Sequence, residues 1–136
     1  TNSAPFSQRK EMLLTDANIY LARDAWLADA AGASAIYGNI TVWDTSLVTS
    51  MQNLFCAYAY ISTCRTSAAG FNDDISRWNT SNVKSMEGMF REATSFNQPL
   101  SFDTSRVTSM RSYMFDGFNQ PLSFDTSSVP RRSTSR

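Results

Sequence analysis

One phrase recurs along this chain. "FNQPLSFDTS" occupies residues 96–105 and returns letter for letter at 118–127, and a looser copy, "FNDDISRWNTS", runs over 71–81. The opening Phe comes back after 25 residues (71 to 96) and then after 22 (96 to 118). A fixed period of this length is typical of stacked repeats, in which each unit buries its apolar face only against its neighbours. We therefore expect successive coils with like side chains in register.

Each copy carries two local patterns. A strand-like alternation of apolar residues comes first, and a "DTSxV" corner follows whose acceptors suit a helix start. Val83, Met86 and Phe90 then recur at helical spacing. The predicted fold is an α+β repeat, a leucine-rich-repeat-like solenoid of short parallel strands and short helical turns with an N-terminal capping helix. The residues expected in the repeat core are Trp43, Val48, Met51, Phe55, Phe71, Ile75, Trp78, Val83, Met86, Phe90, Phe96, Leu100, Phe102, Val107, Met110, Phe115, Phe118, Leu122 and Phe124.

The chain divides into four expected parts. Residues 1–15 are predicted to be a flexible leader and 16–36 the capping helix. The repeat solenoid is predicted over 37–129 as about 3.5 repeats, with an insertion at 56–70. Residues 130–136 are polar and basic, so we expect a disordered tail.

In the capping helix, Ile19 and Trp26 are expected to face inward, and Arg23 and Asp24 outward. The last repeat has no comparable cover, which favours a fragment of a longer array.

Composition excludes several classes of protein. The 136 residues include no His, and 12 basic residues balance 12 acidic ones. Without His, neither a Ser-His or Cys-His nucleophile pair nor an imidazole zinc ligand can form. Balanced charge provides no field that would attract nucleic acid, and no apolar run is long enough to span a membrane. We expect a protein that is not an enzyme, with no catalytic residue, no cofactor, no metal site and no nucleic-acid partner.

Three stretches, "YGNITVWDTSLVTSMQNLF", "FNDDISRWNTSNVKSMEGMF" and "SFNQPLSFDTSRVTSM", carry a family resemblance. They resemble the BspA-like leucine-rich repeat surface proteins, and more narrowly the variant repeat of mycoplasma-type lipoproteins and many protist proteins. The resemblance covers residues 17–129 and implies a secreted or surface-anchored array used for adhesion or protein–protein contact, without shared catalytic residues. The short spacer before Phe118 and the tail after Val129 depart from the pattern.

The expected function is therefore a non-enzymatic interaction or adhesion module, located outside the cell or on its surface, whose protein partner the sequence does not name. A carbohydrate-binding surface module that takes a glycan is one alternative. A truncated fragment without independent activity is another.

The insertion holds both cysteines. Cys56 and Cys64 can form a disulfide, which suits an extracellular protein, or remain reduced and pack as small hydrophobic residues. Tyr58, Tyr60 and Ile61 lie between them and are the candidate interaction surface, because loop aromatics are frequent anchors. The alternative is that these three side chains fold back over the core.

Two polar sets admit more than one interpretation. Asp44, Asn79, Asp103 and Asp125 can line a calcium-binding edge or cap their own turns. A second set can form a mild basic stripe or simply solvate one face. Its members are Arg77, Arg91, Arg106 and Arg111.

Overall fold

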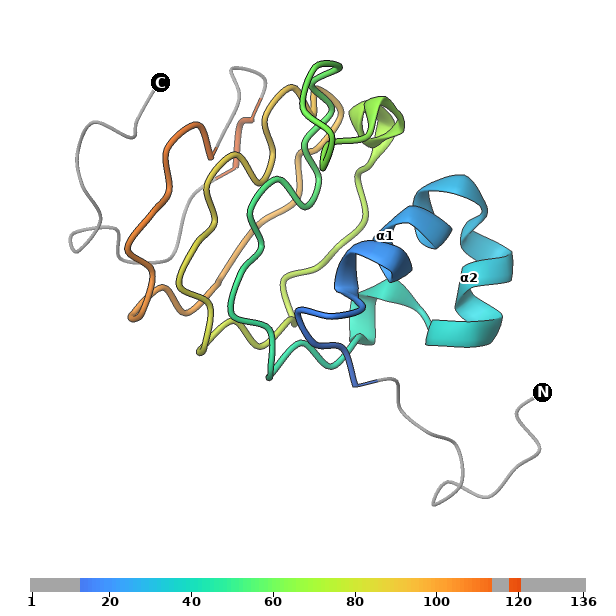
Figure 1. Cartoon of the computed structure of the whole chain (residues 1–136), viewed down its shortest axis with the longest axis horizontal. Helices are drawn as coiled ribbons and strands as arrows, with labels where there is room; N and C mark the ends of the chain where they lie inside the picture. Colours follow the sequence, from blue (N-terminus) through green and yellow to red (C-terminus); the bar gives the residue numbers. More distant parts are fainter. Residues whose placement is uncertain (1–12, 114–117, 121–136) are drawn as a thin grey trace.

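A computed structural model of the chain describes residues 13–113 and 118–120. Its regular elements, in chain order, are α1 (Ile19–Ala28), α2 (Ala30–Tyr37) and the 3₁₀ helices η2 (Ile40–Val42) and η3 (Thr66–Gly70). The rest of the described chain runs back and forth as irregular coils that lie side by side (Figure 1). The two α-helices lie at the N-terminal end of these coils. We call the coils repeat 1 (residues 43–75), repeat 2 (78–100) and repeat 3 (102–113 and 118–120).

The predicted fold class is wrong. Among the described residues no strand forms, and backbone pairing is limited to isolated parallel bridges that join Leu13 to Asp44, Ser50 to Ser85 and Ser85 to Ser109. In the part of the chain that the structure describes, no helix follows the corners of the repeats either. The described part of the chain therefore does not form a leucine-rich-repeat-like solenoid of parallel strands and helical turns.

The corners explain why no helix starts there. Oδ1 of Asp44 accepts the backbone N–H and the hydroxyl of Ser46, at 3.0 and 2.7 Å. The N–H of Val48 then donates to the carbonyl of Thr45 at 3.0 Å, which closes a second turn. A side-chain acceptor that bonds two residues ahead makes a local turn, and such a turn competes with helix formation. Asn79 and Asp103 bond Ser81 and Ser105 in the same way.

A left-handed residue follows each corner. Asn53, Gly88 and Ser112 have φ of 59°, 68° and 58°, and they occupy the same position in the three repeats. A right-handed helix cannot pass through such a conformation. The helical spacing that the sequence shows after each corner is therefore interrupted by the backbone itself.

Backbone hydrogen bonds join equivalent positions of consecutive repeats. The N–H of Met51 donates to the carbonyl of Ser85, and the N–H of Met86 donates to that of Ser109, both at 2.8 Å. These N–H groups bond sideways to the next repeat rather than back along their own segment. Such bonds satisfy buried backbone groups without a regular sheet.

Phenylalanine rings stack through the three repeats. Phe71 lies on Phe96 with ring centroids 5.8 Å apart, and Phe96 lies on Phe118 at 6.1 Å. Within a repeat the rings are closer, at 4.0 Å between Phe55 and Phe71 and 4.2 Å between Phe90 and Phe96. The aromatic pairs thus stack both within and between repeats.

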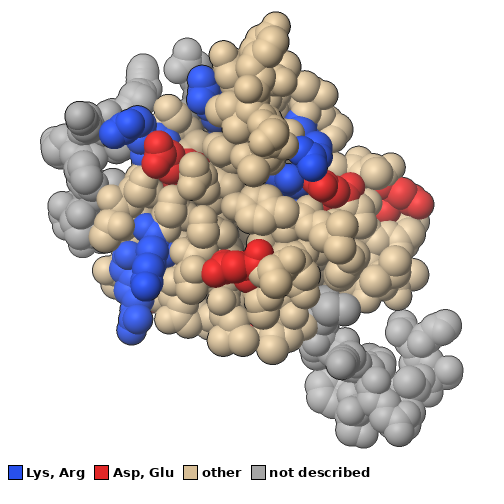
Figure 2. Space-filling view, viewed as in Figure 1, with Lys and Arg blue, Asp and Glu red and all other residues tan. Residues whose placement is uncertain are grey.

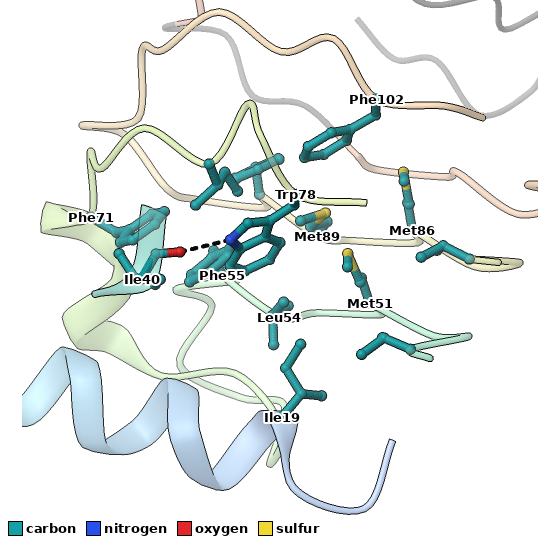
Figure 3. Packing of buried hydrophobic residues seen from close by; sticks show 14 of the residues in the cluster. Ile19, Ile40, Met51, Leu54, Phe55, Phe71, Trp78, Met86, Met89 and Phe102 are labelled. Atoms are coloured by element: carbon teal, nitrogen blue, oxygen red, sulfur yellow. Dashed lines mark hydrogen bonds between the residues drawn. The ribbon is translucent and has the colours of Figure 1, made fainter. Parts of the chain in front are cut away.

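Methionine, tryptophan and aliphatic side chains fill the rest of the core (Figure 3). Met51, Met86 and Met89 are fully buried, and the indole N–H of Trp78 donates to the carbonyl of Ile40 at 2.7 Å. Of the predicted core residues that the structure describes, all are buried except Phe118, which is partly buried. The remaining three, Phe115, Leu122 and Phe124, lie outside the described residues, as do 1–12 and 121–136.

The N-terminal segment forms two helices where one was predicted over 16–36. Asp29 interrupts it with an extended backbone, at φ −161° and ψ 92°. The carboxylate of Asp29 accepts the N–H of Gly32 at 3.2 Å and so caps α2. A good N-cap residue within a helical pattern can end one helix and begin the next.

Polar side chains of α1 and of the turn before it form hydrogen bonds with backbone groups at the exposed edge of repeat 1. Asp16 accepts two backbone N–H groups at 2.9 and 3.3 Å, and the hydroxyl of Tyr20 donates to a carbonyl at 2.5 Å. The guanidinium of Arg23 donates to two further carbonyls at 3.3 and 2.6 Å. All these backbone partners lie in residues 49–54. Asp16, Tyr20 and Arg23 stand at i, i+4 and i+7, so one helical face supplies what the backbone of a neighbouring repeat would otherwise supply.

Arg23 therefore points inward, contrary to the prediction that it faces solvent. Its side chain is 1% exposed and pairs with Asp24 at 2.8 Å. Burial lowers the pKa of Arg23, and the adjacent Asp24 carboxylate partly opposes that shift. The helical pattern of the sequence predicts that this Arg lies at the surface. It is buried instead because the backbone carbonyl groups of repeat 1 need hydrogen-bond donors.

Substitution of Gly88 by Ala tests the recurrent left-handed position. A Cβ on Gly88 would overlap Oδ1 of Asn53, and the residue has φ +68°. We expect Gly88→Ala to lower the free energy of unfolding by about 1–3 kcal/mol, measured in urea. Gly70→Ala is the matched control, because no atom lies within 4 Å of its added Cβ. Equal stability of the two variants would refute this account of the turn.

A second prediction concerns Asp16 and pH. Burial raises the pKa of Asp16, but hydrogen bonds from the Thr49 side chain and from the backbone of Thr49 and Ser50 lower it, and the net pKa is below its ordinary value. The carboxylate therefore stabilises the fold fully above its unfolded pKa of about 3.9, and that contribution is lost as pH falls through the lower folded pKa.

We expect Asp16→Asn to lose about 1 kcal/mol at neutral pH and to unfold with a weaker dependence on pH below 4 than the wild type. Urea unfolding at several pH values measures both effects. Glu92→Gln is the control, since the carboxylate of this exposed residue accepts no hydrogen bond from the described residues. The explanation fails if both variants keep the acid sensitivity of the wild type.

Candidate interaction surface

Two spacers leave the repeats at equivalent points. Residues 56–70 separate the stacked rings of Phe55 and Phe71, and residues 91–95 separate those of Phe90 and Phe96. The distance between ring centroids is almost the same in the two pairs. The length of the spacer therefore does not disturb the stacking of the rings. Both spacers emerge on the same edge of the molecule (Figure 1). We call residues 56–70 and 91–95 the loop edge.

Backbone hydrogen bonds join the two spacers into one surface. The N–H of Ala57 donates to the carbonyl of Arg91 at 2.8 Å, and the N–H of Ser95 donates to that of Ala69 at 3.1 Å. The loop edge therefore spans repeats 1 and 2 and is not a pair of independent loops.

A disulfide closes the base of the longer spacer. Cys56 and Cys64 are bonded, with their Cα atoms 4.8 Å apart, and neither is a free thiol. The N–H of Arg65 donates to the carbonyl of Cys56 at 2.8 Å, beside the disulfide. The covalent bond and this hydrogen bond together hold the two ends of the loop side by side.

Arg65 ties the same loop to α1. Its guanidinium donates to the carbonyls of Ser62 and Cys64 at 2.8 and 2.9 Å, and to Oδ2 of Asp24 at 2.9 Å. Asp24 also pairs with the buried Arg23, so the loop is linked to the element that covers repeat 1.

Of the three predicted interaction residues, Tyr60 is the most exposed, at 86%. Tyr58 is half-buried and meets Tyr60 edge to face, with ring centroids 5.6 Å apart. Ile61 is also half-buried. The structure thus brings the two tyrosines together. In the described part of the chain, no ring contact joins Phe55 to either tyrosine.

Arg91 completes this cluster. Its guanidinium lies over the ring of Tyr58, 4.1 Å from the centroid. The sequence offered Arg91 only as one of several scattered arginines. Its position was nevertheless informative, because Arg91 follows Phe90 as Cys56 follows Phe55, and both residues begin a spacer. Residues that begin equivalent spacers in stacked repeats lie next to each other.

The set of Asp and Asn residues that could line a calcium-binding edge forms turns where the structure describes it. Asp44, Asn79 and Asp103 each accept hydrogen bonds from a Ser two residues later, and such bonds from Ser105 lower the pKa of Asp103. Across residues 13–113 and 118–120, no three His, Cys, Asp or Glu side chains gather in a way that could hold a metal ion. The calcium alternative is therefore not supported where the structure describes this column, and Asp125 lies outside it.

Charged side chains form small groups of both signs, separated by uncharged surface, on the face seen in Figure 2. In the part of the chain that the structure describes, no helix is both long and apolar enough to cross a lipid bilayer.

The comparisons with known proteins place the chain in a family. The family described as "Mycoplasma protein of unknown function, DUF285" matches residues 30–135. That match covers most of the chain, which therefore belongs to this family. No curated protein and no solved structure matches it.

Removal of the disulfide is expected to destabilise the chain. The bridge links residues eight apart, and in the loop-entropy account Cys56→Ala/Cys64→Ala should lower the free energy of unfolding by about 2–3 kcal/mol. Urea unfolding without reductant measures the loss, and the wild type in reductant should approach the double variant. Two free sulfhydryls in a thiol assay of the unreduced wild type would contradict the bridge.

Proposed function

We propose that this chain is a non-enzymatic interaction module whose loop edge contacts another protein at a cell surface or outside the cell. The observation that carries the proposal is the Tyr58–Tyr60–Arg91 cluster on a loop closed by a disulfide. Tyr and Arg are enriched among the residues that dominate binding energy at protein interfaces. A loop ordered before binding loses less conformational entropy on association.

The separation of core from loop supports the same proposal. The stacked rings beneath the spacers do not depend on spacer length, so this edge can change without loss of the fold. Binding residues are often carried by loops that a rigid scaffold positions. Membership of the BspA-like surface proteins, and hence a role in adhesion, is part of this proposal and rests on the resemblance of the repeated words. A disulfide favours an oxidising location.

A carbohydrate-binding role has less support. The C–H face of a sugar ring packs on an open aromatic face, whereas a guanidinium covers the ring of Tyr58. Apart from the exposed Tyr60, the other described aromatic rings of the repeats are buried or partly buried. We therefore propose a protein partner in preference to a glycan.

Adhesion of coated beads tests the proposal. Beads that carry the purified chain should bind intact cultured cells, and Tyr60→Ala should reduce that binding about tenfold or more. The loss should occur without a change in stability, because the side chain of Tyr60 is exposed. Leu47→Ala is the matched control, since Leu47 is an exposed apolar residue, at 52%, in the corner after Asp44.

Treatment of the cells separates the two kinds of partner. Mild protease digestion of the cell surface should abolish binding, and enzymatic removal of glycans should not. The proposal is wrong if glycan removal alone abolishes binding. It is also wrong if Tyr60→Ala and Leu47→Ala behave alike.

A further inference from the structure

Arg91 differs from the other arginine of the loop edge. Both ion pairs in the described residues involve Asp24, one with Arg23 and one with Arg65. Arg91 takes part in neither, and its sequence neighbour Glu92 makes no ion pair with it. The guanidinium of Arg91 is thus held in place by a ring and not by a carboxylate of the described chain.

The stack on Tyr58 leaves the hydrogen-bonding edge of Arg91 unused. A guanidinium that lies over an aromatic ring still presents its N–H groups in its own plane, where a carboxylate can accept two of them. No side-chain hydrogen bond from Arg91 is found among the described residues, while its backbone N–H and carbonyl bond Gly88 and Ala57. The side chain therefore offers an oriented donor, unpaired among the described residues, on the ring of Tyr58, and Tyr58 in turn meets the exposed ring of Tyr60.

We propose that the loop edge binds an acidic protein segment, in which a carboxylate pairs with Arg91 and an adjacent apolar side chain packs on Tyr60. This inference rests on the proposed function and specifies its partner. One oriented guanidinium next to a phenol ring fits a single carboxylate with an apolar neighbour. A sulfated polysaccharide would need a row of free cations, and the second cation of this edge, Arg65, is already paired with Asp24.

Selection from a displayed library of random 12-residue peptides tests the proposal. The wild-type chain with its disulfide intact serves as bait, and peptides that also bind Tyr60→Ala are removed. We expect the selected peptides to be enriched in Asp and Glu. A selected peptide should bind at least about tenfold more weakly when its acids are replaced by Asn and Gln, as measured by fluorescence anisotropy.

Variants of the chain assign that effect to Arg91. Arg91→Gln should weaken the acidic peptide by about tenfold or more, and Arg91→Lys by several-fold, because Lys keeps the charge but not the planar donor pair. Arg77→Gln is the matched control, since it removes the same charge from an exposed arginine outside the loop edge and should leave binding unchanged. Thermal unfolding of each variant checks that the fold persists.

Four results would count against the proposal. If the selected peptides depend on Tyr60 but are neither acidic nor sensitive to Arg91→Gln, this inference fails and the proposed function stands. If Arg77→Gln weakens binding as much as Arg91→Gln, the effect is general charge attraction. If a sulfated polysaccharide binds through Arg91 and acidic peptides do not, the occupant is a glycan. Absence of any peptide that depends on Tyr60 would count against both proposals.

Discussion

The register between repeats is the constraint on which the rest of this structure depends. Phe71, Phe96 and Phe118 stack on one another from repeat to repeat. The Phe55–Phe71 and Phe90–Phe96 pairs stack across the two ends of each spacer. Burial of a Phe side chain contributes about 1.5–3 kcal/mol, and a well-placed ring pair about 0.5–1.5 kcal/mol more. A shift of one residue along the chain would remove these contacts together with the backbone bonds between repeats. Regular strands and helices are not required once that register is kept.

A stack of this kind must also satisfy the backbone groups at its ends. Between repeats the partners are equivalent backbone groups, and buried threonine hydroxyls add to them, as Thr45 donates to the carbonyl of Asn79 at 2.9 Å. At the N-terminal end the partners are the side chains of Asp16, Tyr20 and Arg23. The burial of Arg23 follows from this role, because a charged side chain is tolerated in the interior when carbonyls and a carboxylate receive its donors.

The same register separates the scaffold from the loop edge. The spacers begin after one ring of each pair and end before the other, so the stacked rings meet whatever the length of the spacer, although a spacer residue such as Ala93 is itself buried in the core. Residues 56–70 can therefore carry a disulfide and, together with Arg91, a Tyr-Arg cluster that lie outside the stacked rings. Arg65 and Asp24 connect this loop to α1, which places the exposed tyrosine on an ordered support. The core thus depends on the register of the stacked rings, whereas the candidate interaction surface depends on the contacts of the loop edge.

The sequence by itself determined which residues would be buried and which residues of different repeats would occupy equivalent positions. The reason is that apolar residues repeated at a fixed period are buried when each one packs on its counterpart in the next repeat. It also marked the insertion as the place where the chain leaves the core. Only the tertiary structure decided the local conformation, since the Asx turns and the left-handed residues at Asn53, Gly88 and Ser112 override the strand and helix periods. It likewise decided the inward turn of Arg23 and the pairing of Arg91 with Tyr58. Those contacts join residues 30 or more apart in the chain, and no local pattern encodes a partner at that distance.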